Sequence, residues 1–192
     1  MKRIFLRLGN SFRKRQHAFL LWLHSRDGGI VKEGDLRLNV PLCCDGLGHV
    51  QLGAGIGIGW RSAPMLGDGM VRLQARSQTS RITVGDGTYF SNNVQVIAET
   101  NVRIGTKCLI GDGVLIMDSD GHNLTAERRH DGPSLAADIV VDDNVFIGSR
   151  VIVLKGVTIG KDSVIGAGSV VVRSIPPGVI AAGNPAKVLR PL

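Results

Sequence analysis

Five histidines occur in the chain, and one of them stands where the sequence pattern breaks. His122 follows Asp118-Ser119-Asp120-Gly121, at the point where a regular repeat of apolar residues gives way to a polar segment. An imidazole titrates at about pH 6.5, so it can take a proton from an attacking hydroxyl near neutral pH. His122 is therefore our candidate general base, and the alternative is an ordinary histidine of a surface loop.

Two aspartates lie close enough in sequence to orient this imidazole. Asp120 or Asp118 can serve as the third group that holds a base in place, as in other base-assisted reactions. A backbone carbonyl can do the same, and aspartates are common in turns. Both readings stay open at this point.

Glycine-rich turns downstream offer a second kind of chemistry. Gly148-Ser149 and Gly166-Ala167-Gly168 interrupt the apolar repeat at corner positions. Backbone N–H groups at such corners can face an oxygen on which negative charge develops, and the Ser149 N–H is our candidate. The alternative is an ordinary turn serine. No GxGxxG motif leads from a strand into a helix, and no Walker pattern occurs, so these glycines do not predict a nucleotide loop.

The elements that must position these residues repeat every six residues. This step suits neither an α-helix nor a simple alternating strand, and it is typical of solenoids built from hexapeptide units. β-Branched side chains would stack inward from coil to coil, and small residues would sit near the corners. The two series that carry the repeat are Val141, Ile147, Val153, Ile159, Ile165, Val171 and Val145, Val151, Val157, Ser163, Ser169, Ile175.

The repeat divides the chain into parts. We expect a parallel solenoid over 28–175, with residues 118–138 extruded as a loop, and a tail over 176–192 that begins at two prolines. A loop of about twenty residues inside a regular solenoid is usually functional or disordered. The apolar step also shifts by two residues near Ile97, which predicts a local bulge in the wall.

The first 27 residues differ from the rest in charge. Residues 1–26 contain seven basic side chains and no acidic one, while the remaining residues carry equal numbers of each. The pattern predicts a basic amphipathic α-helix that docks on an anionic inner membrane leaflet. Packing of this helix on the solenoid end or in a subunit contact is the alternative. Because the solenoid itself has no net charge, nucleic-acid binding is not expected.

Cysteine content and hydropathy indicate the compartment. Cys43, Cys44 and Cys108 are an odd set with two adjacent members, which is no disulfide framework. A reducing cytosol is the simplest setting. The apolar stretch Ala18–Leu23 is too short to span a bilayer, and no small-residue cleavage site follows it.

Three segments of the chain resemble the hexapeptide-repeat acyltransferases, in particular the branch of galactoside, maltose and surface-polysaccharide O-acetyltransferases. They read YFSNNV at 89–94, IMDSDGHNL at 116–124, and a long stretch that starts with NVFIGS at 144–149 and ends with AAGNPAKVLR at 181–190. The resemblance implies a left-handed β-helix and a homotrimer with each active site between neighbouring subunits. It departs from the galactoside type at the N-terminus and at Phe146, where that type has tryptophan.

The resemblance also implies roles for single residues. His122 matches the catalytic base, and Asn93 matches the asparagine that places the acceptor. Ser149 after Gly148 matches the position whose N–H faces the thioester oxygen. Gly166 and Ala167 match the corner along which the pantetheine arm runs. Lys187 and Arg190 match basic positions near the phosphates of coenzyme A, although a solvated basic tail is an equally simple reading.

Together these features predict an enzyme that moves an acetyl group from acetyl-CoA to a sugar hydroxyl, with no metal. The setting we expect is surface-polysaccharide assembly (O-antigen, capsule or lipopolysaccharide), on a sugar or a lipid-linked saccharide. The alternatives are N-acetylation of an amino-sugar nucleotide and a non-catalytic structural solenoid. A zinc site like that of hydratases with this fold needs three convergent histidines, and only His122 and His130 lie near each other.

Overall fold

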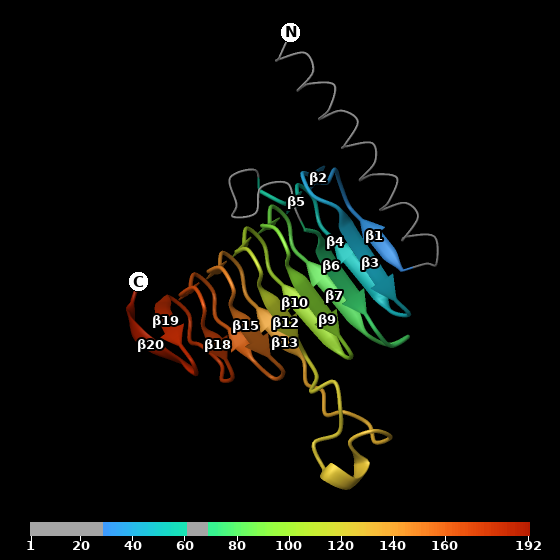
Figure 1. The fold of residues 1–192 in the computed structure, drawn as a ribbon. Coiled ribbons are helices and arrows are strands. Elements are labelled where there is room, and N and C mark those ends of the chain that lie inside the picture. The colour runs from blue at the N-terminus through green and yellow to red at the C-terminus, as the bar shows by residue number, and fades with distance from the viewer. Residues whose placement is uncertain (1–28, 61–68) are drawn as a thin grey trace.

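A computed structural model describes residues 29–60 and 69–192 of the chain. Within these ranges the chain winds around one apolar core, and each turn of the winding adds one strand to each of three sheets (Figure 1). The predicted N-terminal helix falls on residues outside the described ranges. The three-sided parallel solenoid is confirmed.

We name the three sheets A, B and C in the order in which the chain visits them. Sheet A contains β1 (Ile30–Lys32), β4 (His49–Leu52), β7 (Arg81–Val84), β10 (Asn101–Ile104), β13 (Ile139–Val141) and β16 (Thr158–Ile159). Sheet B contains β2 (Arg37–Leu38), β5 (Gly57–Ile58), β8 (Tyr89–Phe90), β11 (Leu109–Ile110), β14 (Phe146–Ile147), β17 (Val164–Ile165), β19 (Val179–Gly183) and β20 (Ala186–Pro191). Sheet C contains β3 (Leu42–Gly46), β6 (Val71–Ala75), β9 (Gln95–Ala98), β12 (Leu115–Met117), β15 (Ile152–Leu154) and β18 (Val170–Val171).

Neighbouring strands of a sheet are parallel because each comes from the next coil. The exception is β20, which folds back antiparallel on β19. The segment expected as a tail therefore contributes two strands to sheet B. The turns between sheets form three edges, which we call the A–B, B–C and C–A edges.

The six-residue repeat marks the core as predicted. Val141, Ile147 and Val153 are fully buried, and the small corner residues Ser163 and Ser169 are buried as well. Each inward side chain packs against the equivalent side chain of the next coil. Burial of each large apolar side chain stabilises the fold by about 1.5–3 kcal/mol. Stability therefore comes from stacking of coils.

The bulge predicted near Ile97 is wrong. β9 pairs with β6 and with β12 without a shift, so Val96 lies in register with Leu73 and Ile116. The two extra residues of this coil lengthen β9 and β10 and are absorbed at the C–A edge. The turn there is held by the buried Asp118 carboxylate, which accepts hydrogen bonds from residues 99 and 100.

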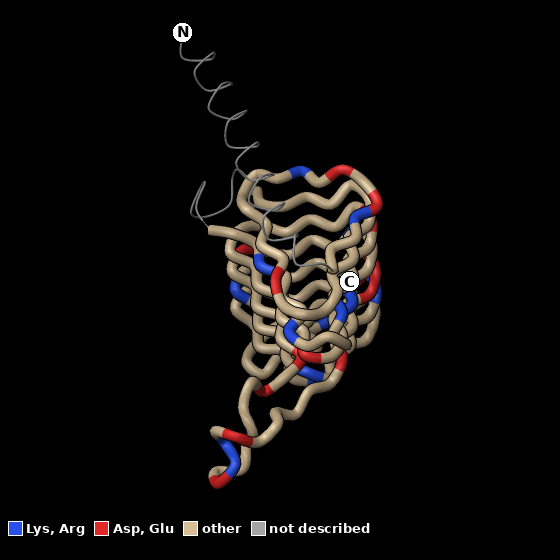
Figure 2. The backbone as a smooth tube through the Cα atoms, turned by 90° about the vertical axis from the view of Figure 1, so that its right-hand side faces the viewer, with Lys and Arg blue, Asp and Glu red and all other residues tan. Residues whose placement is uncertain are grey.

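The extruded loop leaves the C–A edge after β12 and returns at β13, well away from the coils (Figure 1). Its base is a short antiparallel neck that joins Ser119 to Ala136. Further out it contains a single 3-10 turn, η1 (Ala126–Arg128). Figure 2 shows that charged residues gather at its outer end.

Candidate functional site

The B–C edge aligns the turn residues of successive coils. The Gly113 N–H donates to the Asn92 carbonyl at 2.9 Å, the Arg150 N–H to Asp112 at 2.7 Å, and the Gly168 N–H to Ser149 at 2.8 Å. These bonds set Asn93, Gly148-Ser149 and Gly166-Ala167 on one line parallel to the solenoid axis. The structure therefore brings these predicted site residues to the same edge.

Asn93 occupies a strained turn position on this line. Its φ is 58°, in the left-handed region that asparagine tolerates better than most residues. Gly69 passes directly over it, because a Cβ on Gly69 would overlap the Asn93 amide. The preceding Asn92 is fully buried and accepts a hydrogen bond from the Trp60 N–H at 3.0 Å. The corner at Asn93 is thus rigidly built.

Gly148 packs closely against the next coil on this edge. A Cβ on Gly148 would lie 2.6 Å from the Ala167 nitrogen, so only glycine fits. The N–H groups of Ser149 and Ala167 donate no hydrogen bond to any residue that the structure describes. Both lie at a turn, and a carbonyl-type oxygen of a ligand can accept a hydrogen bond from an N–H that has no other partner.

His122 lies on a different edge. It is exposed, at the outer end of the loop neck on the C–A edge. Asp118 and Asp120 differ sharply at this neck. Asp118 is fully buried, and its two oxygens accept from the Glu99 N–H at 2.7 Å and from the Thr100 N–H and hydroxyl at 2.8 and 2.9 Å. Both oxygens of the Asp118 carboxylate are therefore used in hydrogen bonds to the wall of the solenoid.

Asp120 has one oxygen engaged and one available. Its Oδ1 pairs with Lys155 Nζ at 2.5 Å, while its buried Oδ2 has no partner among the described residues. Of the two aspartates, Asp120 is the one that keeps an acceptor oxygen two residues from His122.

Lys187 and Arg190 lie on β20 and are both exposed. Lys187 pairs with Ala182 near the end of β19, and so lies by the B–C edge. Arg190 pairs with Ile180, nearer the A–B edge. Only Lys187 therefore joins the line that carries Ser149 and Ala167.

The predicted residues of one chain thus fall on two edges, and the width of sheet C separates them. The outer side of sheet C is apolar over its last three strands, where half-buried side chains follow each other in register. They are Leu115, Met117, Ile152, Leu154 and Val170, while the preceding β9 has the buried Ile97 and the exposed Gln95 on this side. The sequence contained a signal for this face, because apolar residues flank the buried residue of each of these strands, as Leu115 and Met117 flank Ile116. Our interpretation of the repeat considered only the buried residues.

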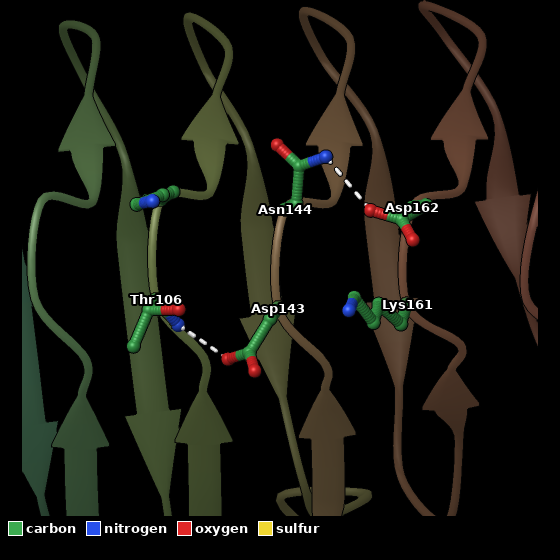
Figure 3. Close-up of a pocket in the computed structure, with 6 residues that line it drawn as sticks. Thr106, Asp143, Asn144, Lys161 and Asp162 are labelled. Carbon is green, nitrogen blue, oxygen red and sulfur yellow. Dashed lines mark hydrogen bonds between the residues drawn. The ribbon is translucent and has the colours of Figure 1, made fainter.

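A shallow pocket of about 360 Å³ lies on the A–B edge, away from all predicted site residues. Two hydrogen bonds join residues that line it: Asp143 Oδ1 accepts from the backbone N–H of Thr106 at 2.7 Å, and the Asn144 side chain donates to Asp162 at 2.8 Å (Figure 3). These bonds join successive coils. We therefore interpret this pocket as a structural turn of the solenoid and not as a ligand site.

Two further features concern metals and membranes. Among the described residues, no group of three or more His, Cys, Asp or Glu side chains converges as metal ligands would. Over 29–60 and 69–192 the chain contains no helix with the length and hydropathy of a membrane span.

Known proteins share the repeat and the fold. Residues 138–173 match the family described as bacterial transferase hexapeptide (six repeats). The galactoside O-acetyltransferase of Escherichia coli is 41% identical over 114 residues, which are 59% of this chain and 56% of that protein. The chain thus spans just over half the length of this curated relative.

Two solved structures are similar. A maltose O-acetyltransferase from Clostridium difficile is 34% identical, covers 58% of this chain and 59% of its own, and gives a TM-score of 0.56. A hexapeptide-repeat acetyltransferase from Vibrio cholerae, complexed with acetyl coenzyme A, gives a TM-score of 0.62 at 26% identity over 95% of this chain and 86% of its own. The chain therefore carries the bacterial transferase hexapeptide repeat over 138–173, and over a little more than half of its length it is similar to galactoside and maltose O-acetyltransferases.

Proposed function

We propose that this protein is an acetyl-CoA-dependent O-acetyltransferase that acts on a sugar hydroxyl. The observation that carries the proposal is the pairing of two features on neighbouring edges. One is a histidine on a loop extruded from the wall, and the other is a glycine-lined edge where the N–H groups of Ser149 and Ala167 have no partner among the described residues. We also infer the left-handed winding of the superfamily, which the similarity to the Vibrio cholerae enzyme supports.

The reaction requires a base because a sugar hydroxyl is far too weak an acid to ionise at neutral pH. Acetyl-CoA supplies the acetyl group as a thioester. The neutral imidazole of His122 takes the hydroxyl proton as the oxygen attacks the thioester carbon. The Ser149 N–H stabilises the charge that develops on the thioester oxygen. When the carbon–sulfur bond breaks, the imidazolium returns its proton to the departing thiolate.

The other residues of the site bind and orient. Asn93 places the acceptor hydroxyl, and Gly166-Ala167 leave room for the pantetheine arm along the B–C edge. Lys187 lies at the same edge, where its ammonium can pair with a phosphate of coenzyme A. Arg190 is placed farther away on β20, and it can reach a phosphate only from the A–B side.

A homotrimer completes this site. His122 and Ser149 lie on different edges of one chain, so a complete site needs the loop of one copy beside the B–C edge of another. The apolar outer side of sheet C lies between these two edges. Its burial against a second copy would remove an exposed apolar surface of a kind that single soluble chains seldom present.

The setting we propose is surface-polysaccharide assembly in the cytoplasm, with a sugar or a lipid-linked saccharide as acceptor. The basic segment 1–26, which lies outside the described residues, would then make peripheral contact with the anionic inner leaflet. Deletion of residues 1–26 should abolish co-sedimentation with phosphatidylglycerol vesicles. Unchanged sedimentation would remove the membrane contact from the proposal.

An acetyl-transfer assay tests the activity itself. Purified protein is incubated with acetyl-CoA and a panel of hexoses, amino sugars and nucleotide sugars, and the free thiol is followed. We expect transfer to hydroxyls, and a loss of about 10²–10⁴ in kcat for His122→Ala with little change in KM for acetyl-CoA. His130→Ala, on the same loop, is the matched control and should keep its activity. Acetylation of amino sugars alone would show that the protein is an N-acetyltransferase, and equal background rates in all variants would favour a non-catalytic solenoid.

A further inference from the structure

The neck of the extruded loop contains an ion pair that the family resemblance did not point to. Lys155 follows β15 at the C–A edge, and Leu154 beside it is in register with Met117 at the end of β12. Its ammonium lies 2.5 Å from Asp120 Oδ1. The pair therefore joins the coil after the loop to the residue where the loop departs.

This pair is the most buried of the three ion pairs among the described residues; the pair between Arg72 and Asp45 is 39% and 30% exposed. The side chains of Lys155 and Asp120 are only 30% and 18% exposed. The pair between Arg103 and Asp142 on sheet A is 53% and 35% exposed. Partly desolvated charges attract each other more strongly and are screened less by salt. The carboxylate of Asp120 is thus held in one place.

Backbone bonds close the neck around the same point. The Asp120 N–H donates to Leu135 at 3.0 Å, and the Ala137 N–H donates to Asp118 at 2.9 Å. Gly156, next to Lys155, donates its N–H to Ala137 at 3.0 Å. Asp120 is the last residue of the outgoing strand that these bonds fix, and His122 is two residues farther on.

We propose that Lys155 acts through Asp120 as a positioning residue for His122, so that the ion pair aims the imidazole. This inference rests on the proposed function. Asp120 Oδ2 is buried and has no partner among the described residues, and it belongs to a carboxylate two residues from His122 that can accept the imidazole N–H. A carboxylate that accepts this proton selects the tautomer whose other nitrogen is the base. Lys155 itself touches neither substrate nor reacting atoms in this scheme.

Lys155→Met tests the proposal because it removes the charge and keeps the length. We expect kcat to fall about tenfold or more, with KM for acetyl-CoA within about twofold, and Lys155→Arg to restore most of the rate. Asp120→Asn should lower kcat similarly, and the double variant should be no slower than either single one, since both act on one unit. The matched control is Arg103→Met, which breaks the ion pair on sheet A and should leave kcat unchanged.

A second measurement does not depend on activity. In proton NMR of the full chain, with the His122 signal assigned from His122→Gln, Lys155→Met should shift or broaden the His122 imidazole resonance, and Arg103→Met should not. An unmoved His122 signal or an unchanged kcat in Lys155→Met would overturn the positioning role. If the wild-type protein transfers no acetyl group but the His122 signal moves as expected, the ion pair stands and the proposed function fails.

Discussion

Sheets A and C of the same solenoid present opposite outer surfaces. On sheet A the outward side chains bond to one another between coils: Arg103 to Asp142 at 2.8 Å and Asn101 to Asp138 at 3.1 Å. On sheet C, from β12 onward, the outward positions are apolar and stack in register, as with Met117 against Leu154. A face whose polar side chains bond to one another is stable in contact with water. An exposed apolar face is stabilised when another protein surface covers it.

The comparison extends to the edges that border these faces. The A–B edge has Asp143 and Asn144 bonded to neighbouring coils. At the B–C edge, in contrast, the N–H groups of Ser149 and Ala167 have no partner among the described residues. The same hexapeptide turn is thus closed on one side of the molecule and open to a ligand on another.

The largest effect should come from a charge on the apolar face. Leu154→Glu would place a carboxylate where we propose that a second copy packs, and burial of an unpaired charge costs several kcal/mol. We expect the mass measured by light scattering to fall to that of one chain, and transferase activity to fall at least 100-fold.

Thr158→Glu, at an exposed position on sheet A, is the matched control and should change neither quantity. If both variants behave alike, the contrast between the two faces has no bearing on assembly.

The next effect concerns two aspartates of different burial. Asp118→Ala removes three hydrogen bonds at a fully buried site and leaves the N–H groups of Glu99 and Thr100 without partners. We expect a loss of about 3 kcal/mol in the free energy of unfolding by urea. Asp142→Ala on sheet A should cost no more than about 0.5 kcal/mol. Equal losses would contradict the assignment of Asp118 to the wall.

Acid should weaken the closed A–B edge. The N–H and hydroxyl of Thr106 lower the pKa of Asp143 below its ordinary value. A carboxyl group whose pKa is depressed by folding stabilises the protein above its unfolded pKa of about 4, and this stabilisation is lost as the pH falls through the folded value. The urea midpoint should therefore drop between pH 7 and pH 3, and it should drop less in Asp143→Asn. An identical drop in both proteins would remove Asp143 as a cause.

The smallest effect is a difference in thiol reactivity at the N-terminal end of sheet C. Burial raises the pKa of Cys44 to about 12, and Cys43 on the outer side is only half-buried. In native protein at pH 8 we expect a disulfide reagent to modify Cys43 slowly, and Cys44 and Cys108 only after denaturation. Cys43→Ser should abolish the native reaction. Rapid labelling of Cys44 would mean that this end of the core opens readily.

The repeat made the fold predictable, but one local inference from it failed. The six-residue spacing of residues such as Val141 and Ile147 was enough to predict that they form a buried row, because in a hexapeptide coil every sixth side chain faces the core. The same spacing suggested a bulge near Ile97. The added residues instead lengthen β9 and β10 on either side of the turn, because the parallel ladder would lose hydrogen bonds if a strand slipped.

Residue types and their periodicity thus determined the solenoid, its core and the point at which His122 leaves the wall, because these depend on contacts that recur from coil to coil. Tertiary structure alone decided which edge each site residue occupies, which aspartate is spent on the wall, and that Lys155 meets Asp120. Those facts depend on distances between residues 18 or more positions apart, for which a repeating pattern provides register but no side-chain geometry.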